Sequence, residues 1–559
     1  MKPRTTLAIA FLLICLFIIQ GVVFIRANSQ TYDEAMHLAA GYSYLTRHDF
    51  RLEPQNPPLI KEYLALPVFL AYRLPFNPDS QRWNDDAEHL VGYDFLYKSS
   101  VHADEIIALS RLFNLFLGVG VIALVGWWAS RLWGGGAAML AMALASLDPN
   151  FVAHSSLVTT DVGVTLLIFL SAYLFWEYFL SPRWWLLIAT GIAVGMALNA
   201  KFSGILLFAI MPLIVVLSLA LDRNYFLLPS KKRGQAGYHL VQSATLLLLI
   251  FLLAMLAIPP VYFFQGFQAW LSGFYRFLTL AQAGQSAFFL GEYSYQGWWN
   301  YFLVAFLIKT PVGSLILIVA SIVFWRWGSA LRSRDAIFLL VPVLAVFLAT
   351  TQAKVDIGLR HILPVYPFLF VLAGRLATIH VGPGPLMPLL LGVPLIFTAI
   401  SSVRISPHHI AYFNELVGGP DQGYRYLVDS NLDWGQDLKG VKSYMEKERL
   451  PIIYLSYFGT APPSYYGIRY QYVPGTWPLE WPPPAERVPA DAPRKMLAIS
   501  ANNLQELATF NDPLFRWLRA RQPITKIGYS IFVYDLTRDP EGLRDLAATY
   551  DKAGVSLSD

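Results

Sequence analysis

The chain has 559 residues, of which 55% are hydrophobic and only 14% are charged. Soluble domains carry about 25% charged residues, so this composition excludes an ordinary soluble protein and predicts a polytopic membrane protein. The formal net charge of +5 does not indicate a nucleic-acid partner, because the basic residues cluster in short loops between apolar segments. The single cysteine, Cys15, excludes an intramolecular disulfide.

A helix that crosses a bilayer needs about 20 mostly apolar residues. The first candidate, residues 6–26, is interpreted as an uncleaved anchor. Ten further candidates bring the predicted number of spans to eleven: 108–129, 134–150, 157–180, 184–199, 202–221, 238–262, 300–325, 336–351, 360–378 and 384–403. In the fifth span, Gly191 and Gly195 share one helix face and predict the close approach of a neighbouring helix.

The distribution of Lys and Arg in short loops predicts the orientation of the spans. If the N-terminus is cytoplasmic, most basic loop residues lie on the inner side, including Arg131, Arg183 and residues 231–233. The short outer loops then hold only Lys201, Lys354 and Arg360. We therefore expect a multi-pass protein of the plasma (inner) membrane. Its loops 27–107 and 263–299, and everything after residue 402, would be extracytoplasmic.

The tail differs in character from the apolar segments before it. Residues 452–457, 496–500 and 530–534 read as short strands, and helical patterns cover 435–448 and 502–510. The sequence thus predicts a membrane domain over residues 1–403 and an extracytoplasmic α/β domain over residues 404–559.

Charged side chains near the outer ends of the predicted spans are the candidate functional residues, because charges in a bilayer are costly. The acidic candidates, which could accept a proton from a hydroxyl, are Asp33, Glu34 and Asp161. The basic candidates, which could neutralise a phosphate or pyrophosphate, are Lys61, Arg111, Lys201, Lys309 and Arg360. This combination predicts the transfer of a group from an anionic lipid headgroup.

Each candidate also has a structural interpretation. Asp33 and Glu34 could cap a juxtamembrane helix, with their carboxylates at its positive end. Arg111 and Arg360 could extend to the membrane interface, and Lys201 could be a solvated loop charge.

Structural interpretations also exist for His154, Asp161 and Lys309. His154 and Asp161 are seven residues apart and would share a helix face, or would pair between the third and fourth spans. Lys309 precedes Pro311 and would sit at a kink, paired with a carboxylate.

Five motifs follow one another along residues 1–405. They are Tyr-Asp-Glu at 32–34 with Asn-Pro-Pro-Leu-Ile-Lys at 56–61, Ser-Arg-Leu-Phe-Asn at 110–114, His-Ser-Ser-Leu-Val-Thr-Thr-Asp at 154–161, Asn-Ala-Lys-Phe-Ser-Gly at 199–204, and Gly-Leu-Arg-His-Ile-Leu-Pro-Val-Tyr-Pro at 358–367. In this order, they resemble bacterial members of the GT-C glycosyltransferases of family 39, the protein O-mannosyltransferase and aminoarabinose transferase type.

The resemblance implies an inverting transferase whose donor is a sugar on a polyprenyl-phosphate carrier. It implies that Asp33 is the general base and that Arg111 contacts the donor phosphate, with Lys61 in a similar role. Eukaryotic protein mannosyltransferases carry a β-trefoil insert in a later loop, and the 263–299 loop is too short for one. This departure argues against a protein acceptor. The sugar stays open, and the acceptor is a glycan, a lipid or a protein.

The predicted site thus has Asp33 as base, supported by Glu34 and Asp161, and a donor-phosphate site of Lys61, Arg111, Lys201 and Arg360. His154, Lys309 and His37 are assigned either to acceptor binding or to structure. Asp33 and His37, four residues apart, are also candidate ligands for a divalent cation, although a metal-free site is preferred. The alternative function is a transporter or flippase of polyprenyl-linked glycans.

One motif of the tail has no assigned role. Residues 429–437 read Asp-Ser-Asn-Leu-Asp-Trp-Gly-Gln-Asp. Asp429, Asp433 and Asp437 either bind a cation or mark the solvated start of a helix, and the second interpretation is favoured.

Overall fold

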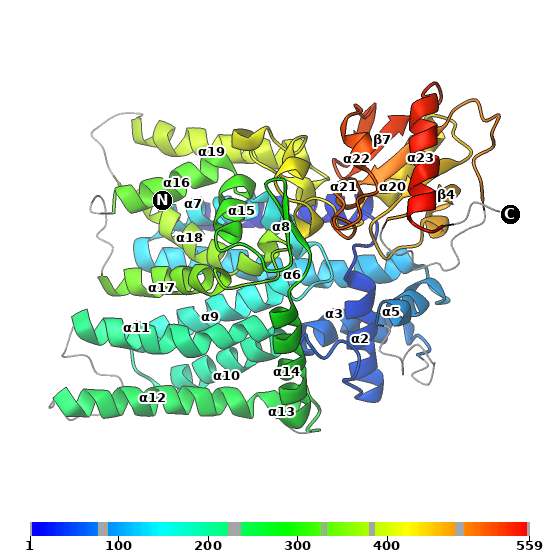
Figure 1. Cartoon of the computed structure of the whole chain (residues 1–559). Coiled ribbons are helices and arrows are strands. Elements are labelled where there is room, and N and C mark those ends of the chain that lie inside the picture. The colour runs from blue at the N-terminus through cyan, green and yellow to red at the C-terminus, as the bar shows by residue number, and fades with distance from the viewer. Residues whose placement is uncertain are drawn as a thin grey trace.

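The computed structural model describes residues 3–76, 88–221, 236–265, 267–325, 327, 333–379, 386–475 and 486–555. The basic stretch 231–233 lies outside these ranges. Long helices lie side by side in one bundle, and a small domain from the C-terminal part of the chain covers one end of it (Figure 1). We call this end of the bundle the domain end.

The helices of the bundle follow the predicted apolar segments. They are α1 (Pro3–Ala27), α6 (Ala103–Trp133), α7 (Gly135–Ser146), α8 (Pro149–Ser155), α9 (Asp161–Leu180), α10 (Trp184–Ala200), α11 (Leu207–Leu221), α12 (Ala236–Leu256), α15 (Tyr301–Lys309), α16 (Val312–Val323), α17 (Ser333–Thr350), α18 (Val365–Gly374) and α19 (Leu386–Ile405).

The structure is that of a multi-pass membrane protein. Among the described residues, five helical stretches are long and apolar enough to cross a bilayer: Arg4–Ala27, Ala103–Trp133, Asp161–Leu180, Phe202–Leu221 and Val241–Val261. Two bent helix pairs, α7 with α8 and α15 with α16, raise this number to as many as seven. Shorter apolar helices cover Trp184–Ala200, Val365–Thr378 and Leu389–Ile405. The total of eleven spans stays a prediction.

The sharpest bend follows a proline. The axes of α15 and α16 differ by 113°, and Pro311 separates the two helices. Proline lacks the N–H that a continuous helix needs and clashes with the preceding turn. The kink predicted at Pro311 is confirmed.

The two glycines of α10 permit close packing against α12. A Cβ atom at Gly191 would lie 2.5 Å from the Cβ of Leu253, and one at Gly195 would lie 2.6 Å from the carbonyl oxygen of Ala254. Only a residue without a side chain fits at such distances. The helix contact predicted from the glycine spacing is confirmed.

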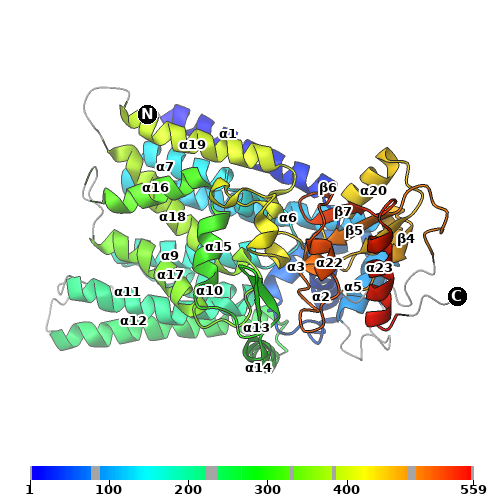
Figure 2. The same ribbon diagram turned by 45° about the horizontal axis from the view of Figure 1, so that its top comes forward.

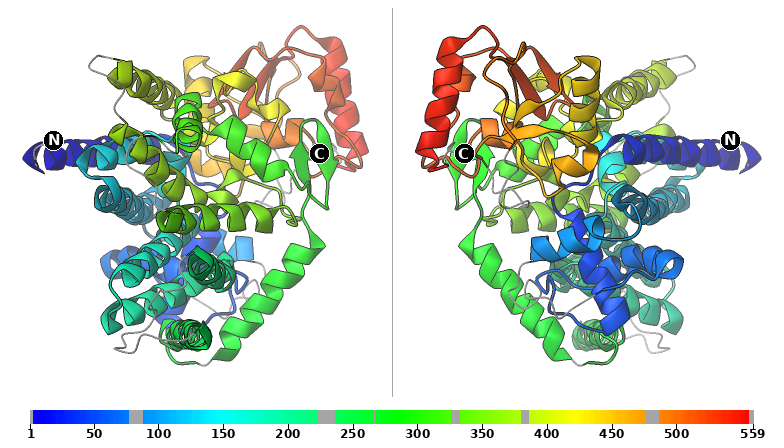
Figure 3. Two further views of the ribbon diagram at one scale, coloured as in Figure 1. Left: turned by 90° about the vertical axis from the view of Figure 1, so that its left-hand side faces the viewer. Right: turned by 90° about the vertical axis from the view of Figure 1, so that its right-hand side faces the viewer.

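The segments that connect the spans at the domain end form additional helices. The segment after α1 contains α2 (Glu34–Arg47), α3 (Leu59–Tyr72) and α5 (Glu88–Tyr97). The segment before α15 contains α13 (Ile258–Val261), α14 (Phe267–Ala283) and a hairpin of β1 (Ala287–Phe289) and β2 (Glu292–Ser294). Figures 1 and 3 show that α14 runs across the direction of the bundle helices, along one side of the molecule.

The small domain is built on a five-stranded sheet with the strand order β4-β3-β5-β7-β6. The strands are β3 (Ile453–Ser456), β4 (Tyr470–Tyr472), β5 (Met496–Ser500), β6 (Thr525–Ile527) and β7 (Ile531–Asp535), and the helices are α20 (Leu438–Lys447), α21 (Ala501–Leu504), α22 (Arg516–Arg519) and α23 (Pro540–Lys552). The three strands predicted from the sequence correspond to β3, β5 and β7.

Side chains alternate between the two faces of this sheet, as the pleat of a strand requires. In β7, Ile531 and Val533 belong to the apolar cluster that contains α20, and Phe532 and Tyr534 belong to the cluster that contains α23. Figure 2 shows the domain at the same end of the bundle as α2, α3 and α5. The segment after α1 and the C-terminal domain, which lie far apart in the sequence, are therefore both at the domain end.

Candidate active site

Four charged side chains form a continuous chain of ion pairs at the domain end. Nη1 of Arg360 lies 2.9 Å from Oδ2 of Asp33 and 3.9 Å from Oδ2 of Asp161. Oδ1 of Asp161 in turn accepts a hydrogen bond from Nζ of Lys201 at 2.6 Å. Acidic and basic side chains thus alternate along this chain of ion pairs. Asp33 and Arg360, which form one of the pairs, are separated by 327 positions in the sequence.

The ends of secondary-structure elements position these four side chains. Asp33 is the residue before α2, and Asp161 is the first residue of α9. Lys201 follows the last residue of α10, and Arg360 lies in a short 3-10 helix (Leu359–Ile362) before α18. All four residues therefore lie at a helix end or directly next to one.

The site is partly open. The side chains of Asp33, Lys201 and Arg360 are 17%, 15% and 10% exposed, whereas Asp161 is buried. Nε of Arg360 and Oδ2 of Asp161 are buried and make no hydrogen bond with any residue that the structure describes. The cluster therefore retains binding capacity for a ligand.

Two histidines lie beside this chain of charges. His154 and His361 both interact electrostatically with Asp161, and among the described residues Nδ1 of His154 and Nε2 of His361 have no hydrogen-bond partner. Sequence reasoning did not single out His361, although it lies within the motif at 358–367.

Glu34 and Arg111 form a separate, fully buried pair. Nε and Nη2 of Arg111 donate to the two oxygens of Glu34 at 2.8 and 2.6 Å. Glu34 also accepts the backbone N–H groups of Val158 and Thr31 at 2.8 and 2.7 Å. The remaining N–H groups of Arg111 donate to the carbonyls of Ile25, Asn28 and Ser29. Every N–H group of the guanidinium is therefore engaged within the protein.

Lys61 is engaged in the same way. Its ammonium donates to the hydroxyl of Tyr44 at 2.8 Å and to the carbonyl of Glu53 at 2.9 Å, and it lies 3.5 Å from Oε2 of Glu53. Nδ1 of His37 lies 2.8 Å from the same carboxylate. Burial alone would raise the pKa of Glu53, but His37 and Lys61 lower it to about 2.

Nδ1 of His37 therefore faces Glu53. Within the described ranges, no group of three or more His, Cys, Asp or Glu side chains is arranged to hold a metal ion.

Lys309 also has a structural environment. Its ammonium donates to the main-chain carbonyls of Ile410 and Asn431 and lies 4.7 Å from the ring centre of Phe413. The predicted location at a kink is confirmed, but the hydrogen-bond partners are carbonyls instead of the expected carboxylate.

A helix does begin at this motif, since α20 starts directly after Asp437, but the three carboxylates are buried and the predicted solvation is wrong. Asp433 accepts the backbone N–H of Asn502 at 3.1 Å, and Asp437 accepts the hydroxyl of Ser530 at 2.6 Å. The motif also contributes Trp434, whose ring centre lies 4.3 Å from the guanidinium carbon of Arg360. Sequence reasoning missed this residue because it considered only the charges of the motif.

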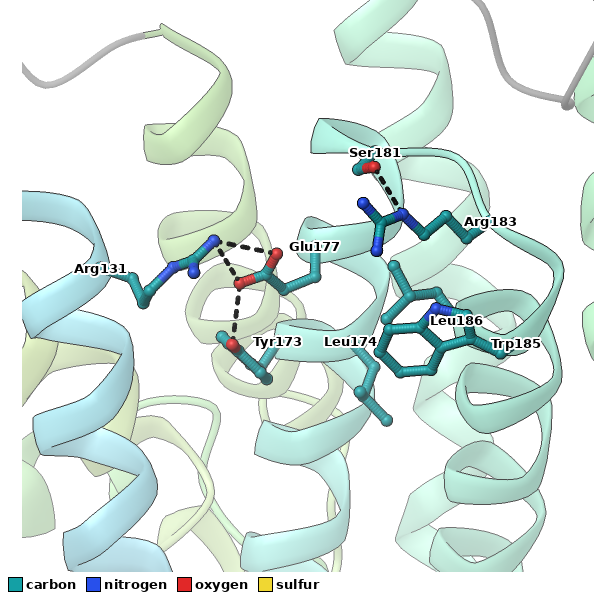
Figure 4. A pocket seen from close by; sticks show the side chains of 8 residues that line it. All are labelled: Arg131, Tyr173, Leu174, Glu177, Ser181, Arg183, Trp185 and Leu186. Carbon is teal, nitrogen blue, oxygen red and sulfur yellow. Dashed lines mark hydrogen bonds and ion pairs between the residues drawn. The ribbon is translucent and has the colours of Figure 1, made fainter.

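A pocket of about 360 Å³ lies at the other end of the bundle. Figure 4 shows it between α6, α9 and α10, where Arg131 and Glu177 form an ion pair. The pocket is lined by residues from the C-terminal end of α9, and this 20-residue helix is about 30 Å long. The pocket is therefore remote from Asp161 at the first position of α9.

Comparisons with known proteins agree with this architecture. Residues 8–269 match the family model of dolichyl-phosphate-mannose-protein mannosyltransferases, a range that includes Asp33, Asp161 and Lys201 and ends before Arg360. No curated protein matches the sequence of the chain.

Among solved structures, apo ArnT from Cupriavidus metallidurans is similar, with a TM-score of 0.50 and 14% identity over 94% of this chain and 97% of that chain. ArnT from the same organism bound to undecaprenyl phosphate gives a TM-score of 0.47 and 13% identity over 95% and 98% of the two chains. The apo Archaeoglobus fulgidus oligosaccharyltransferase gives 0.45 and 11% identity over 72% of this chain and 56% of that chain. Residues 8–269 are thus similar to the mannosyltransferase family, and the chain has the fold of ArnT over almost its whole length.

Proposed function

We propose that the protein transfers a sugar from a polyprenyl-phosphate carrier to an acceptor hydroxyl, with inversion at the anomeric carbon, on the extracytoplasmic face of the plasma (inner) membrane. The observation that carries this proposal is the partly exposed chain of Asp33, Arg360, Asp161 and Lys201 at one end of the bundle. The match to a family named for dolichyl-phosphate-mannose supports a lipid-phosphate donor.

The donor phosphate would bind to Arg360 and Lys201. Arginine presents a planar set of N–H groups that suits phosphate oxygens, and Nε of Arg360 has no hydrogen-bond partner among the described residues. A phosphate on Arg360 would compete with Asp33 for the guanidinium. Donor binding would thereby release the Asp33 carboxylate to act on the acceptor.

In the transfer step, the acceptor oxygen would form a bond to the anomeric carbon as the bond from that carbon to the phosphate oxygen breaks. The electron pair of the broken bond leaves with the polyprenyl phosphate, and Arg360 and Lys201 stabilise the added charge. The acceptor proton passes to Asp33, a contribution of about 10²–10⁴-fold to the rate. Asp161 would hold the two cations in place through its contacts of 2.6 and 3.9 Å.

Arg111 and Lys61 would support this step indirectly. Both were expected at the donor phosphate, but the hydrogen-bonding capacity of each is used within the protein. Arg111 fixes Ser29 and Glu34, on either side of the segment that carries Asp33. Lys61 fixes Glu53, which in turn holds His37 on α2.

The placement of the predicted outer segments supports an extracytoplasmic site. The segment after α1 and the C-terminal domain were both assigned to the outer side by the basic-residue bias. In the structure both lie at the domain end of the bundle (Figure 2). The Asp33–Arg360 pair lies at this same end.

The test uses purified protein in lipid nanodiscs with a polyprenyl-phosphate donor carrying a labelled sugar, and an extract of envelope glycans and lipids as acceptor. A transferase releases free polyprenyl phosphate and labels an acceptor, and Asp33→Asn does neither. In proteoliposomes, a transporter or flippase would move the donor across the bilayer with its sugar–phosphate bond intact. Intact donor after incubation with every acceptor fraction would refute the transferase proposal.

A further inference from the structure

The acidic motif of the tail, which we call the 429–437 loop, lies between the helix bundle and the C-terminal domain. Every residue from 427 to 438 is buried. The proposed transfer mechanism assigns no role to this loop, although it contacts both segments that carry the central ion pair.

One half of the loop holds the backbone just before Arg360. The hydroxyl of Ser430 donates to the carbonyl of Ile357 at 2.7 Å, and Oδ1 of Asn431 accepts the backbone N–H of Leu359 at 2.9 Å. These two bonds flank Gly358, where an added Cβ would lie 2.1 Å from the hydroxyl oxygen of Ser430. The loop and the segment before Arg360 are therefore in direct contact.

The other half of the loop holds the backbone just before Asp33. The backbone N–H of Tyr32 donates to the carbonyl of Trp434 at 2.9 Å, and that of Ser29 donates to the carbonyl of Gln436 at 2.8 Å. The last residue before Asp33 is thus bonded directly to the loop.

The side chain of Trp434 completes the contact with the ion pair. Its ring lies against the guanidinium of Arg360 at 4.3 Å and also contacts the ring of His154, at a centroid distance of 6.3 Å. A guanidinium stacked on an aromatic face keeps its N–H groups free at its edges. The guanidinium of Arg360 thus lies between the Trp434 ring and Asp33, which its Nη1 contacts at 2.9 Å.

The C-terminal domain holds the loop through several contacts, such as that of the Ser530 hydroxyl with Asp437, and the side chain of Asn502 makes two of them. Asn502 accepts the backbone N–H of Asp429 at 2.6 Å, and its amide nitrogen donates to the carbonyl of Asp433 at 2.8 Å. Asn502 lies in α21, directly after β5, which is the central strand of the sheet. Asp429 itself has the left-handed backbone conformation, with φ of 56°, which costs energy in a residue other than glycine.

We propose that the 429–437 loop is the element that positions Asp33 and Arg360 relative to each other, with Trp434 as the positioning residue for the guanidinium. The C-terminal domain then takes part in the transfer step by holding this loop, in addition to any contact with the acceptor. This inference rests on the proposed function, because that proposal assigns the ion pair its role in transfer.

The first experiment compares Trp434→Leu, Trp434→Phe and Trp517→Leu in the donor-cleavage assay. Trp517 is a matched control, because it also lies against an arginine, Arg521 at 5.0 Å, but in the C-terminal domain. Loss of one cation–π contact at the transition state corresponds to a decrease in kcat of about 3- to 30-fold. We expect this decrease in Trp434→Leu with little change in the KM of the acceptor, partial recovery in Trp434→Phe, and the kcat of the wild type in Trp517→Leu.

Equal kcat values for Trp434→Leu and Trp517→Leu, at equal thermal stability, would overturn the inference. The partial recovery by Phe distinguishes positioning by an aromatic face from a general packing defect, which would leave kcat for Phe as low as for Leu.

A second experiment does not depend on any substrate and so separates this inference from the proposed function. It measures hydrogen–deuterium exchange of the segments 29–37 and 357–363 in wild type, Asn502→Ala and Trp517→Leu. If the domain positions the ion pair through the loop, Asn502→Ala accelerates exchange in both segments and Trp517→Leu in neither. Unchanged exchange in Asn502→Ala would overturn the inference even if the wild type proves active, and faster exchange would support it even if the wild type cleaves no polyprenyl-phosphate donor.

Discussion

Asp33 and Glu34 are neighbours in the sequence, yet their carboxylates pair with two different arginines. Asp33 contacts Arg360 at 2.9 Å and is 17% exposed, whereas Glu34 is fully buried against Arg111 at 2.6 Å. They lie at the start of α2, where successive side chains point in directions about 100° apart. One carboxylate therefore faces the candidate site, and the other joins the segment after α1 to the bundle.

This division predicts opposite phenotypes for two similar substitutions. Asp33→Asn should lower the transfer rate by about 10²–10⁴-fold with a Tm close to that of the wild type, because it removes the base from a partly exposed site. Glu34→Gln should chiefly lower stability, since breaking a buried pair costs about 3–5 kcal/mol. Measurements of turnover and thermal unfolding on both variants test this difference between Asp33 and Glu34. A loss of rate in Glu34→Gln and a loss of stability in Asp33→Asn would assign the base to Glu34.

Replacing Arg360 or Arg111 by lysine should also give two different phenotypes. Arg360→Lys replaces a planar fork by a point charge and should weaken donor cleavage at unchanged Tm. Arg111→Lys cannot reproduce the contacts to Glu34 and three carbonyls, so it should lower Tm and the yield of folded protein. The measurements are donor cleavage and thermal unfolding in detergent. A stable Arg111→Lys that has lost donor binding would place Arg111 at the phosphate after all.

Asp429 predicts a pH dependence of donor binding. Burial raises its pKa to about 7, although Arg360 opposes the rise, and the other titratable groups that interact with it are Asp33, Tyr32 and Tyr301. As the pH increases through 7, Asp429 ionises and adds negative charge beside the proposed phosphate site. The KM for the donor should therefore increase above pH 7 in the wild type, and less in Asp429→Asn. Parallel KM profiles from pH 5.5 to 8.5 in both proteins would exclude Asp429 as the cause.

Asp433 predicts a pH dependence of stability. Burial raises its pKa to about 8 in the folded protein, compared with an ordinary value of 3.8. The folded state thus retains a proton that the unfolded state releases, so this group lowers stability as the pH increases from about 4 to 8. Asp433→Asn removes the titration, and its Tm relative to wild type should increase between pH 5 and pH 8.5. A constant difference in Tm would show that Asp433 is ionised in the folded protein throughout this range.

The close contact between α10 and α12 predicts that Gly195 does not tolerate substitution by a larger residue. Gly195→Leu should destabilise the protein by about 1–3 kcal/mol or more, because a side chain there overlaps the backbone of α12. Ile192→Leu is the matched control, since Ile192 is on the same helix but 47% exposed. Thermal unfolding of both variants in the same lipid checks this prediction, and equal Tm values would contradict it.

The sequence alone was sufficient for features that depend on local patterns. Runs of apolar residues predicted the bundle helices, and the spacing of Gly191 and Gly195 predicted a close helix contact. Short strand-like runs in the polar tail predicted β3, β5 and β7. The sequence also identified Asp33, Asp161 and the cations near them as one set of candidates, because charged side chains in or near membrane spans are energetically costly and often functional.

The tertiary structure decided which of these charges meet. Arg111 pairs with Glu34 and His37 with Glu53, although the sequence placed Arg111 at the phosphate and His37 beside Asp33. Trp434 reaches Arg360 from a loop that pairs with the segment before Asp33. Local patterns specify which residues sit at the ends of helices, because they depend on neighbours a few positions away. The rotation of each helix and the path of the tail depend on packing across hundreds of residues, and these alone determine which carboxylate faces which cation.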